Sequence, residues 1–422
     1  MQLTANFFML LFGTVVVLAL LVQEWLASRH IRHILAKRDR VPDAFAGSIS
    51  LTAHQKAADY SMAKTRLGRI ELVYDTSLLL VWTLGGGLAL LNAAWLQLGW
   101  DPLPTGVAVM MSFFLLGSLL DVPFSAWATF NLETHFGFNH STPGLFVADL
   151  AKQAVLLLAI GTPLIALVLW LMQVTGTYWW LYVWAVWIGF SLLMMWAYPA
   201  FIAPLFNKFA PLDNAELRSR IENLLARCGF HSEGIFIMDG SRRSGHGNAY
   251  FTGLGRNKRI VFFDTLIHAL EPDEIEAVLA HELGHFKRKH VQKRLTGMLL
   301  MSLGGLALLG WLAEQPAFYQ GLGVPAPSTQ EPSTHMALLL FMLAAPVFSL
   351  FLQPLFSRLS RKHEFEADDY AAEQTGARHL VSALVKLYRD NASTLTPDPL
   401  YSAFHDSHPP APVRVAKLGT RG

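Results

Sequence analysis

The sequence has few charged residues and only one cysteine, and each deficit excludes a class of protein or site. Charged residues make up 15% of the 422 residues and hydrophobic residues 53%, whereas soluble domains carry about 25% charged residues. A deficit of this size is typical of a protein embedded in a membrane. The lone cysteine, Cys228, excludes an intramolecular disulfide and a zinc site built from several cysteines. The net charge of +2 gives no indication of a nucleic-acid partner.

Long apolar segments predict seven membrane-spanning helices. A helix that crosses a bilayer needs about 20 predominantly apolar residues. The segments that meet this requirement are 5–23, 76–99, 106–128, 153–174, 178–203, 295–313 and 336–356. No lysine or arginine precedes the first segment, so we interpret it as a retained span and not as a cleaved signal peptide.

The positions of the positive charges predict the orientation of these helices. If the N-terminus lies outside and each segment crosses once, the inside segments are 28–75, 131–152, 204–294 and the tail after residue 357. All 33 lysine and arginine residues fall in these segments, as the positive-inside rule requires. We therefore expect these parts to be cytoplasmic, and we attribute the basic loop 28–75 to this rule and not to a substrate site. The short outside loops and the lack of a retrieval signal favour a bacterial inner membrane over the endoplasmic reticulum.

The chain is predicted to contain two regions. Residues 1–203 form a five-span membrane region that includes the cytoplasmic loop 28–75, and residues 204–422 contain a polar insertion, the last two spans and a cytoplasmic tail. The short β-type runs of the insertion lie at 234–238, 248–252 and 259–263. A helix begins at Pro272, with acidic residues in its first turn. We therefore expect a membrane all-α bundle of seven transmembrane helices with a small cytoplasmic α+β domain.

The helix that begins at Pro272 carries the run His281-Glu282-Leu283-Gly284-His285. Two histidines four residues apart share one helix face, so both imidazoles can reach a single metal ion. Glu282 lies beside them and can accept a proton from a water molecule that the metal activates. The alternative is a chance match on a polar helix, which the independently predicted helix start disfavours.

A third metal ligand is expected from the segment after the last span. A catalytic zinc ion usually has three protein ligands and one position open to water. Glu364 and Asp368 are four residues apart, so they share a helix face, and Glu364 could bind the metal while Asp368 accepts the second ring N–H of a ligand histidine. Glu366 has no acidic partner at this spacing and His363 points to a different face, so we prefer Glu364. Without the histidine pair, a solvated charged helix would be the better interpretation.

The chain resembles the type I CAAX prenyl endopeptidases, the a-factor-converting membrane zinc metalloproteases of the gluzincin class. The matching runs are Gly-Phe-Asn at 137–139, Asn-Ala-Tyr at 248–250, Arg-Ile-Val at 259–261, Phe-Asp-Thr-Leu at 263–266, His-Glu-Leu-Gly-His at 281–285, Glu-Phe-Glu-Ala-Asp at 364–368 and Ser-His-Pro-Pro at 407–410 with Arg414. These runs extend over nearly the whole chain, and their order and spacing together are specific. The resemblance implies that the cytoplasmic domain is of the gluzincin metalloprotease type.

The resemblance implies a role for each residue of the metal site. His281, His285 and Glu364 would bind one zinc ion per chain, and Glu282 would be the general base.

The resemblance also implies a substrate site. The substrate would lie along an edge strand at Asn248, Ala249 and Tyr250, where main-chain hydrogen bonds can hold an extended peptide whatever its side chains. His408 would stabilise the oxyanion of the tetrahedral intermediate, and Arg414 would pair with acidic groups near the site.

The implied function is that of an integral-membrane zinc metalloendopeptidase that removes C-terminal tripeptides from prenylated proteins. Its partners would be peptide or protein substrates and membrane lipid, and no nucleic acid. Two alternatives stay open: a general quality-control protease for membrane proteins, and a non-catalytic seven-span protein with a structural zinc site. The complete metal-binding run with its glutamate favours an enzyme.

Overall fold

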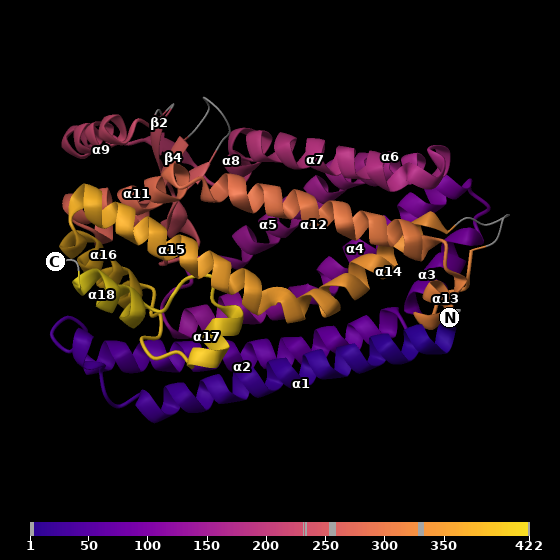
Figure 1. Ribbon diagram of the computed structural model, residues 1–422, viewed down its shortest axis with the longest axis horizontal. Helices are drawn as coiled ribbons and strands as arrows, with labels where there is room; N and C mark the ends of the chain where they lie inside the picture. Colours follow the sequence, from indigo (N-terminus) through magenta and orange to yellow (C-terminus); the bar gives the residue numbers. More distant parts are fainter. Residues whose placement is uncertain (1–3, 231, 233, 253–258, 328–332, 421–422) are drawn as a thin grey trace.

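The computed structural model describes residues 4–230, 232, 234–252, 259–327 and 333–420, which form an elongated, mostly helical body (Figure 1). Two long helices, α1 (Ala5–Lys37) and α2 (Leu51–Trp82), pack against each other along one side of this body. The N-terminus lies at one end of the long axis, and the C-terminus lies at the other end together with the strands.

Six described helices are long and apolar enough to cross a membrane, and there are seven if one bent pair is counted as a single span. The six are Ala5–Lys37, Pro102–Glu133, Pro143–Val174, Gly176–Phe206, His290–Ala313 and Thr334–Thr375. The bent pair is α2 and α3 (Gly87–Leu96), which meet at 49°. The break lies at Gly86, whose φ of 77° is a left-handed conformation that favours glycine. Each predicted segment overlaps one of these helices or the pair, so a multi-pass helical bundle is confirmed, whereas the count of seven depends on the pair.

The segment 28–75 is mostly helical, so its prediction as a loop is wrong. Helix α1 continues to Lys37, and α2 begins after Ser50, whose hydroxyl accepts a hydrogen bond from Ala53 N. Ile34 and Met62 are buried where the two helices pack. The polar residues of this segment are helical because the two helices continue beyond their apolar segments and still bury one face against each other.

The bundle has one apolar core that draws on helices distant in sequence. Its fully buried side chains include Leu88, Val109, Leu169, Leu309 and Leu340. The other helices of this part are α4 (Pro102–Trp127), α5 (Pro143–Leu156), α6 (Thr162–Val174), α7 (Trp179–Ala197), α8 (Ala203–Phe206), α12 (His290–Ala313), α13 (Pro316–Gly321) and α14 (Thr334–Ser349).

A four-stranded sheet lies at the C-terminal end of the body. Its strands are β1 (Phe209–Pro211), β2 (Gly234–Met238), β3 (Ala249–Thr252) and β4 (Arg259–Phe263), in the order β1-β2-β4-β3. β2 and β4 are parallel, and β3 is antiparallel to β4 with Ala249 opposite Phe262. Three of these strands agree with the prediction to within one residue, whereas β1 is only three residues long and contains a proline. In the sheet that the described residues form, β3 is an edge strand with one side unpaired.

The remaining described helices bring two distant segments together. They are α9 (Ala215–Cys228), α10 (Asp264–Ala269), α11 (Pro272–Lys287), α15 (Gln353–Thr375), α16 (Ala377–Asp390), α17 (Pro399–His405) and α18 (Ala411–Gly419). α11 and α15 approach closely at Gly284, because a Cβ atom there would lie 2.9 Å from Ala367 Cα. Glycine at this position therefore allows the two helices that carry the predicted metal ligands to touch.

Candidate active site

The predicted metal-binding run lies on α11, whose start is fixed by local sequence. Pro272 is the first helical residue, and Glu271 and Glu274 form a capping box in which each side chain accepts from the other's backbone N–H. His281 and His285 share one helix face, with their Nε2 atoms 3.3 Å apart. Leu283 is buried in the apolar core, so packing of the other face holds both imidazoles toward α15.

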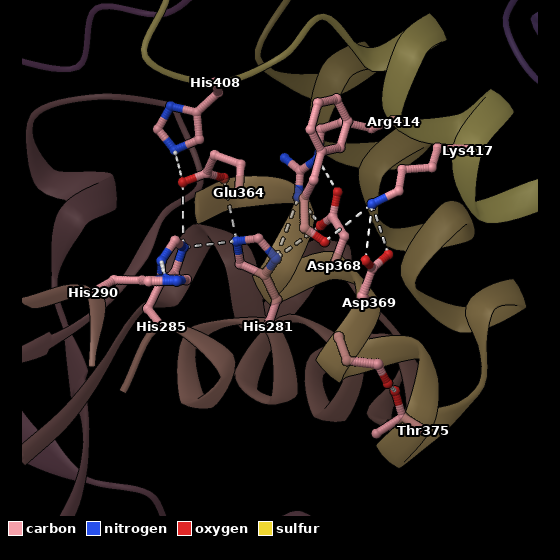
Figure 2. Close-up of polar contacts among 12 residues, drawn as sticks. His281, His285, His290, Glu364, Asp368, Asp369, Thr375, His408, Arg414 and Lys417 are labelled. Atoms are coloured by element: carbon pink, nitrogen blue, oxygen red, sulfur yellow. Dashed lines mark hydrogen bonds and ion pairs between the residues drawn. The ribbon is translucent and has the colours of Figure 1, made fainter. Parts of the chain in front are cut away.

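Glu364 on α15 completes a group of three possible metal ligands (Figure 2). Its Oε1 lies 3.2 Å from His285 Nε2, and its Oε2 lies 3.4 Å from His281 Nε2. One ligand atom from each of the three residues lies within 4.8 Å of the other two. Glu364 Oε2 is buried and accepts no hydrogen bond in the described part of the chain. Two imidazole nitrogens, one carboxylate and an orphaned buried oxygen together fit a divalent cation, and this donor set is typical of catalytic zinc.

A buried ion pair holds His281 from the other side. His281 Nδ1 lies 2.8 Å from Asp368 Oδ1, and Arg414 of α18 donates to both oxygens of Asp368 at 2.9 and 2.5 Å. Burial lowers the pKa of His281, but the carboxylates of Asp368 and Glu364 raise it more, to about 9. The two carboxylates therefore favour positive charge at this position, whether a proton or a metal ion supplies it.

A second support, which the sequence analysis missed, holds His285. His285 Nδ1 lies 3.0 Å from His290 Nδ1, and His290 Nε2 lies 2.9 Å from Glu366 Oε2. The ring of His290 stacks on His363 at 4.1 Å between centroids. Lys289 has a φ of 58°, and the turn at this residue ends α11 and places His290 beside His285. The only signal in the sequence is a histidine five residues after His285, at the end of the basic run 287–290.

Glu282 lies between the two histidines in sequence and is partly exposed. Among the described residues, its carboxylate has no hydrogen-bond or ion-pair partner. A carboxylate that is not engaged elsewhere is available to exchange a proton with a molecule bound at the site.

Of the remaining predicted residues, His408 contacts a candidate ligand, and the side chains of Asn248 and Tyr250 contact other groups. His408 Nε2 lies 3.4 Å from Glu364 Oε1, and its side chain is 62% exposed. Asn248 lies just before β3, where its Oδ1 accepts from Ala249 N at 2.8 Å. The hydroxyl of Tyr250 contacts Met238 Sδ at 3.9 Å. His408 therefore reaches the candidate site, whereas the side chains of Asn248 and Tyr250 contact their own sheet.

Two cavities meet beside this site. A polar cavity of about 1070 Å³ is lined by Asn248 and His408, and an apolar cavity of about 1710 Å³ lies among the bundle helices. His405 and Ser407 line both cavities. The segment that carries His408 therefore separates a polar space from an apolar one.

Comparisons with known proteins agree over nearly the whole chain. Residues 30–208 match the family described as CAAX prenyl protease N-terminal, five membrane helices, and residues 211–421 match Peptidase family M48. The CAAX prenyl protease 1 homolog of Oryza sativa subsp. japonica is 35% identical over 401 residues, which cover 92% of each chain. CAAX prenyl protease 1 of Saccharomyces cerevisiae is 34% identical and covers 90% of this chain and 88% of its own. The crystal structure of S. mikatae Ste24p superposes with a TM-score of 0.91 at 31% identity, covering 97% of this chain and 99% of its own.

Proposed function

This chain belongs to peptidase family M48 and is a multi-pass membrane metalloendopeptidase, and from that premise we propose that it cleaves prenylated proteins near their C-terminus with one zinc ion held by His281, His285 and Glu364. The observation that carries the proposal is the convergence of these three side chains from α11 and α15. Glu364 follows His281 and His285 by 83 and 79 positions in the sequence, so the two histidines and the glutamate come from separate helices.

Zinc bound by these residues would act as a Lewis acid and lower the pKa of a coordinated water toward about 7. The protein supplies the proton transfers and the charge stabilisation. Glu282 is the proposed general base, because its carboxylate is unengaged and adjacent to both histidine ligands. It accepts the proton of the attacking water and delivers it to the amine of the leaving peptide.

His408 and Arg414 are proposed to act in different ways. The ring of His408 is exposed to the polar cavity and lies 3.4 Å from Glu364, so it can donate to the oxyanion that forms on the substrate carbonyl. The guanidinium of Arg414 is buried and engaged by Asp368. This geometry supports a role for Arg414 in holding Asp368 against His281 instead of contact with the substrate.

The substrate is proposed to pair with the free edge of β3 and to place its lipid in the apolar cavity. The relatives in rice and yeast are named as CAAX prenyl proteases. The apolar cavity is lined by residues such as Met298, Leu309 and Phe341, which suit an isoprenoid chain. From the distribution of Lys and Arg we propose that the site faces the cytoplasm, and from the short outside loops that the membrane is a bacterial inner membrane.

Cleavage assays on the purified protein test this function. We expect the wild type to cleave a C-terminally prenylated peptide and to cleave the same peptide without its lipid more slowly. Glu282→Gln should keep its zinc by elemental analysis and lose at least about 100-fold in rate, because it lacks a proton acceptor.

Other outcomes would favour the alternatives. Equal rates on lipidated and unlipidated peptides would favour a general membrane-protein protease. Stoichiometric zinc with no cleavage of any peptide by the wild type would favour a structural zinc site.

A further inference from the structure

The polar cavity lies between helices α1 and α2 and the end of the molecule that carries the metal ligands. Its wall includes Lys64 and Arg69 of α2, Asn248 before β3 and His408 after α17. Its volume of about 1070 Å³ slightly exceeds the range of about 300–1,000 Å³ found for ligand pockets. A peptide that leaves the candidate active site past Asn248 therefore enters a space that is large enough to hold it.

One cation in this wall lacks a counter-ion. Arg69 is paired with Glu24 at 2.7 Å, so its charge is neutralised. Lys64 has no carboxylate partner among the described residues, and its Nζ lies 5.1 Å from the ring centroid of Tyr60. Asp406 is the one carboxylate among the described residues that line the cavity, and no ion pair joins it to Lys64. Lys64 is therefore a cation of the cavity wall that forms no ion pair with any described carboxylate and can meet an incoming anion.

A cluster of side chains connects Lys64 to the start of β3. The hydroxyl of Tyr60 donates to Glu133 Oε1 at 2.5 Å and lies 3.3 Å from His246 Nε2. The ring of His246 stacks on Phe138 at 4.2 Å between centroids. His246 is two residues before Asn248, so the wall that carries Lys64 and the strand that would hold the substrate are fixed by the same contacts.

The polarity of β3 places the substrate C-terminus on this side. β3 runs from Ala249 to Thr252, and its free edge accepts an extended peptide. Antiparallel pairing is the more stable arrangement per residue, and in it the C-terminal residues of the peptide lie at the Ala249 end. A tripeptide spans at most about 10 Å, so the terminal carboxylate of a peptide paired in this way would lie within about 10 Å of the scissile bond, on the side of the polar cavity.

We propose that Lys64 binds the C-terminal carboxylate of the substrate, so that the polar cavity recognises a free chain end. This inference rests on the proposed function. A lysine suits the task because its ammonium is a compact charge on a flexible stem that can follow leaving peptides of different side chains. Recognition of the chain end would make the enzyme cut close to a free C-terminus instead of within a chain.

The test uses one prenylated peptide in two forms, with a C-terminal carboxylate or a C-terminal amide. We expect the wild type to cleave the acid with a kcat/KM about tenfold or more above that of the amide, as a charge-assisted contact implies. Lys64→Ala should reduce this ratio to near one by slowing cleavage of the acid alone, and Lys64→Arg should restore most of it. Arg66→Ala is the matched control: it removes a neighbouring exposed cation of α2 that does not line either cavity, and it should keep the wild-type ratio.

The possible failures are distinguishable. If the wild type cleaves the acid and the amide equally, or if Lys64→Ala keeps the wild-type ratio, the inference is overturned while the proposed function stands. If neither form is cleaved by the wild type, the proposed function itself is wrong.

Discussion

At the scale of single residues, the two proposed histidine ligands are held by different kinds of partner. His281 faces the charged pair of Asp368 and Arg414, whereas His285 faces the neutral ring of His290, which in turn faces Glu366. Both arrangements fix the Nε2 atom of the ligand toward the site by engaging its Nδ1 atom. Partners of this kind raise the basicity of the ligand and hold its ring in place.

The second arrangement predicts that His290 contributes to metal affinity without touching the metal. His290→Ala should weaken zinc binding by about 10- to 100-fold, the usual cost of removing such a partner. Zinc affinity is measured by competition with a chelator, which requires no catalytic activity. Glu366→Gln should cost less, because the amide oxygen can still accept from His290.

His363→Ala is the control for this prediction. His363 stacks on His290 but makes no hydrogen bond to a proposed ligand within the described part of the chain. Unchanged zinc affinity in His290→Ala, or an equal loss in His363→Ala, would show that the hydrogen bond to His285 has no role in binding.

At the scale of elements, the site depends on how α11 is fixed to its neighbours. Gly284 allows contact with α15, and Glu274 in the first turn ties α11 to α16. Glu274 accepts hydrogen bonds from Ser382 Oγ at 2.6 Å and from Lys386 Nζ at 2.8 Å, and its side chain is 6% exposed. Removal of a buried, hydrogen-bonded charge lowers the free energy of unfolding by about 1–3 kcal/mol.

The Glu274 contact predicts a stability that depends on pH. Burial raises the pKa of Glu274, but Lys386, Ser382 and the backbone N–H of Glu271 lower it more, so the net shift is downward. A carboxyl whose pKa is lower in the folded state stabilises the fold above its unfolded pKa, which is about 4.3, and loses this contribution as pH falls through the folded pKa. Glu274→Gln should therefore lower the thermal midpoint at pH 7, and the difference from wild type should shrink below about pH 4.

Comparison of the two proteins at each pH cancels any effect of acid on the metal site. Glu276→Gln serves as the control. Glu276 pairs with Arg227, which is 54% exposed, and exposed ion pairs contribute less to folding stability than buried ones. A difference between Glu274→Gln and wild type that stays constant from pH 7 to pH 3 would contradict the assignment.

At the scale of the whole molecule, much of the fold follows from apolar periodicity and charge. The spans were predictable because a run of about 20 apolar residues rarely forms anything other than a membrane-crossing helix. The helical extension of α1 and α2 beyond their apolar segments was not predictable from polarity, since polar residues suit both a loop and a solvated helix. The three-residue strand β1 carries too little pattern to be recognised.

The residues of the site could be predicted where their spacing along one helix sets the relative positions of their side chains. They could not be predicted where the chain reverses its direction. His281 with His285, and Glu364 with Asp368, are each four residues apart on one helix. The contact of His290 with His285 depends on a left-handed residue at Lys289, and that of Lys64 with the polar cavity depends on the packing of α2 against distant segments. Neither conformation has a signature in the local sequence.

If α11 and α15 deliver three ligands to one metal ion, the zinc content of the protein depends on each of these ligands. Elemental analysis of the purified protein should find one zinc per chain in the wild type and sharply less in Glu364→Ala, while Glu366→Gln keeps most of its zinc. Full zinc occupancy in Glu364→Ala, or a wild type that binds no divalent metal, would contradict the account.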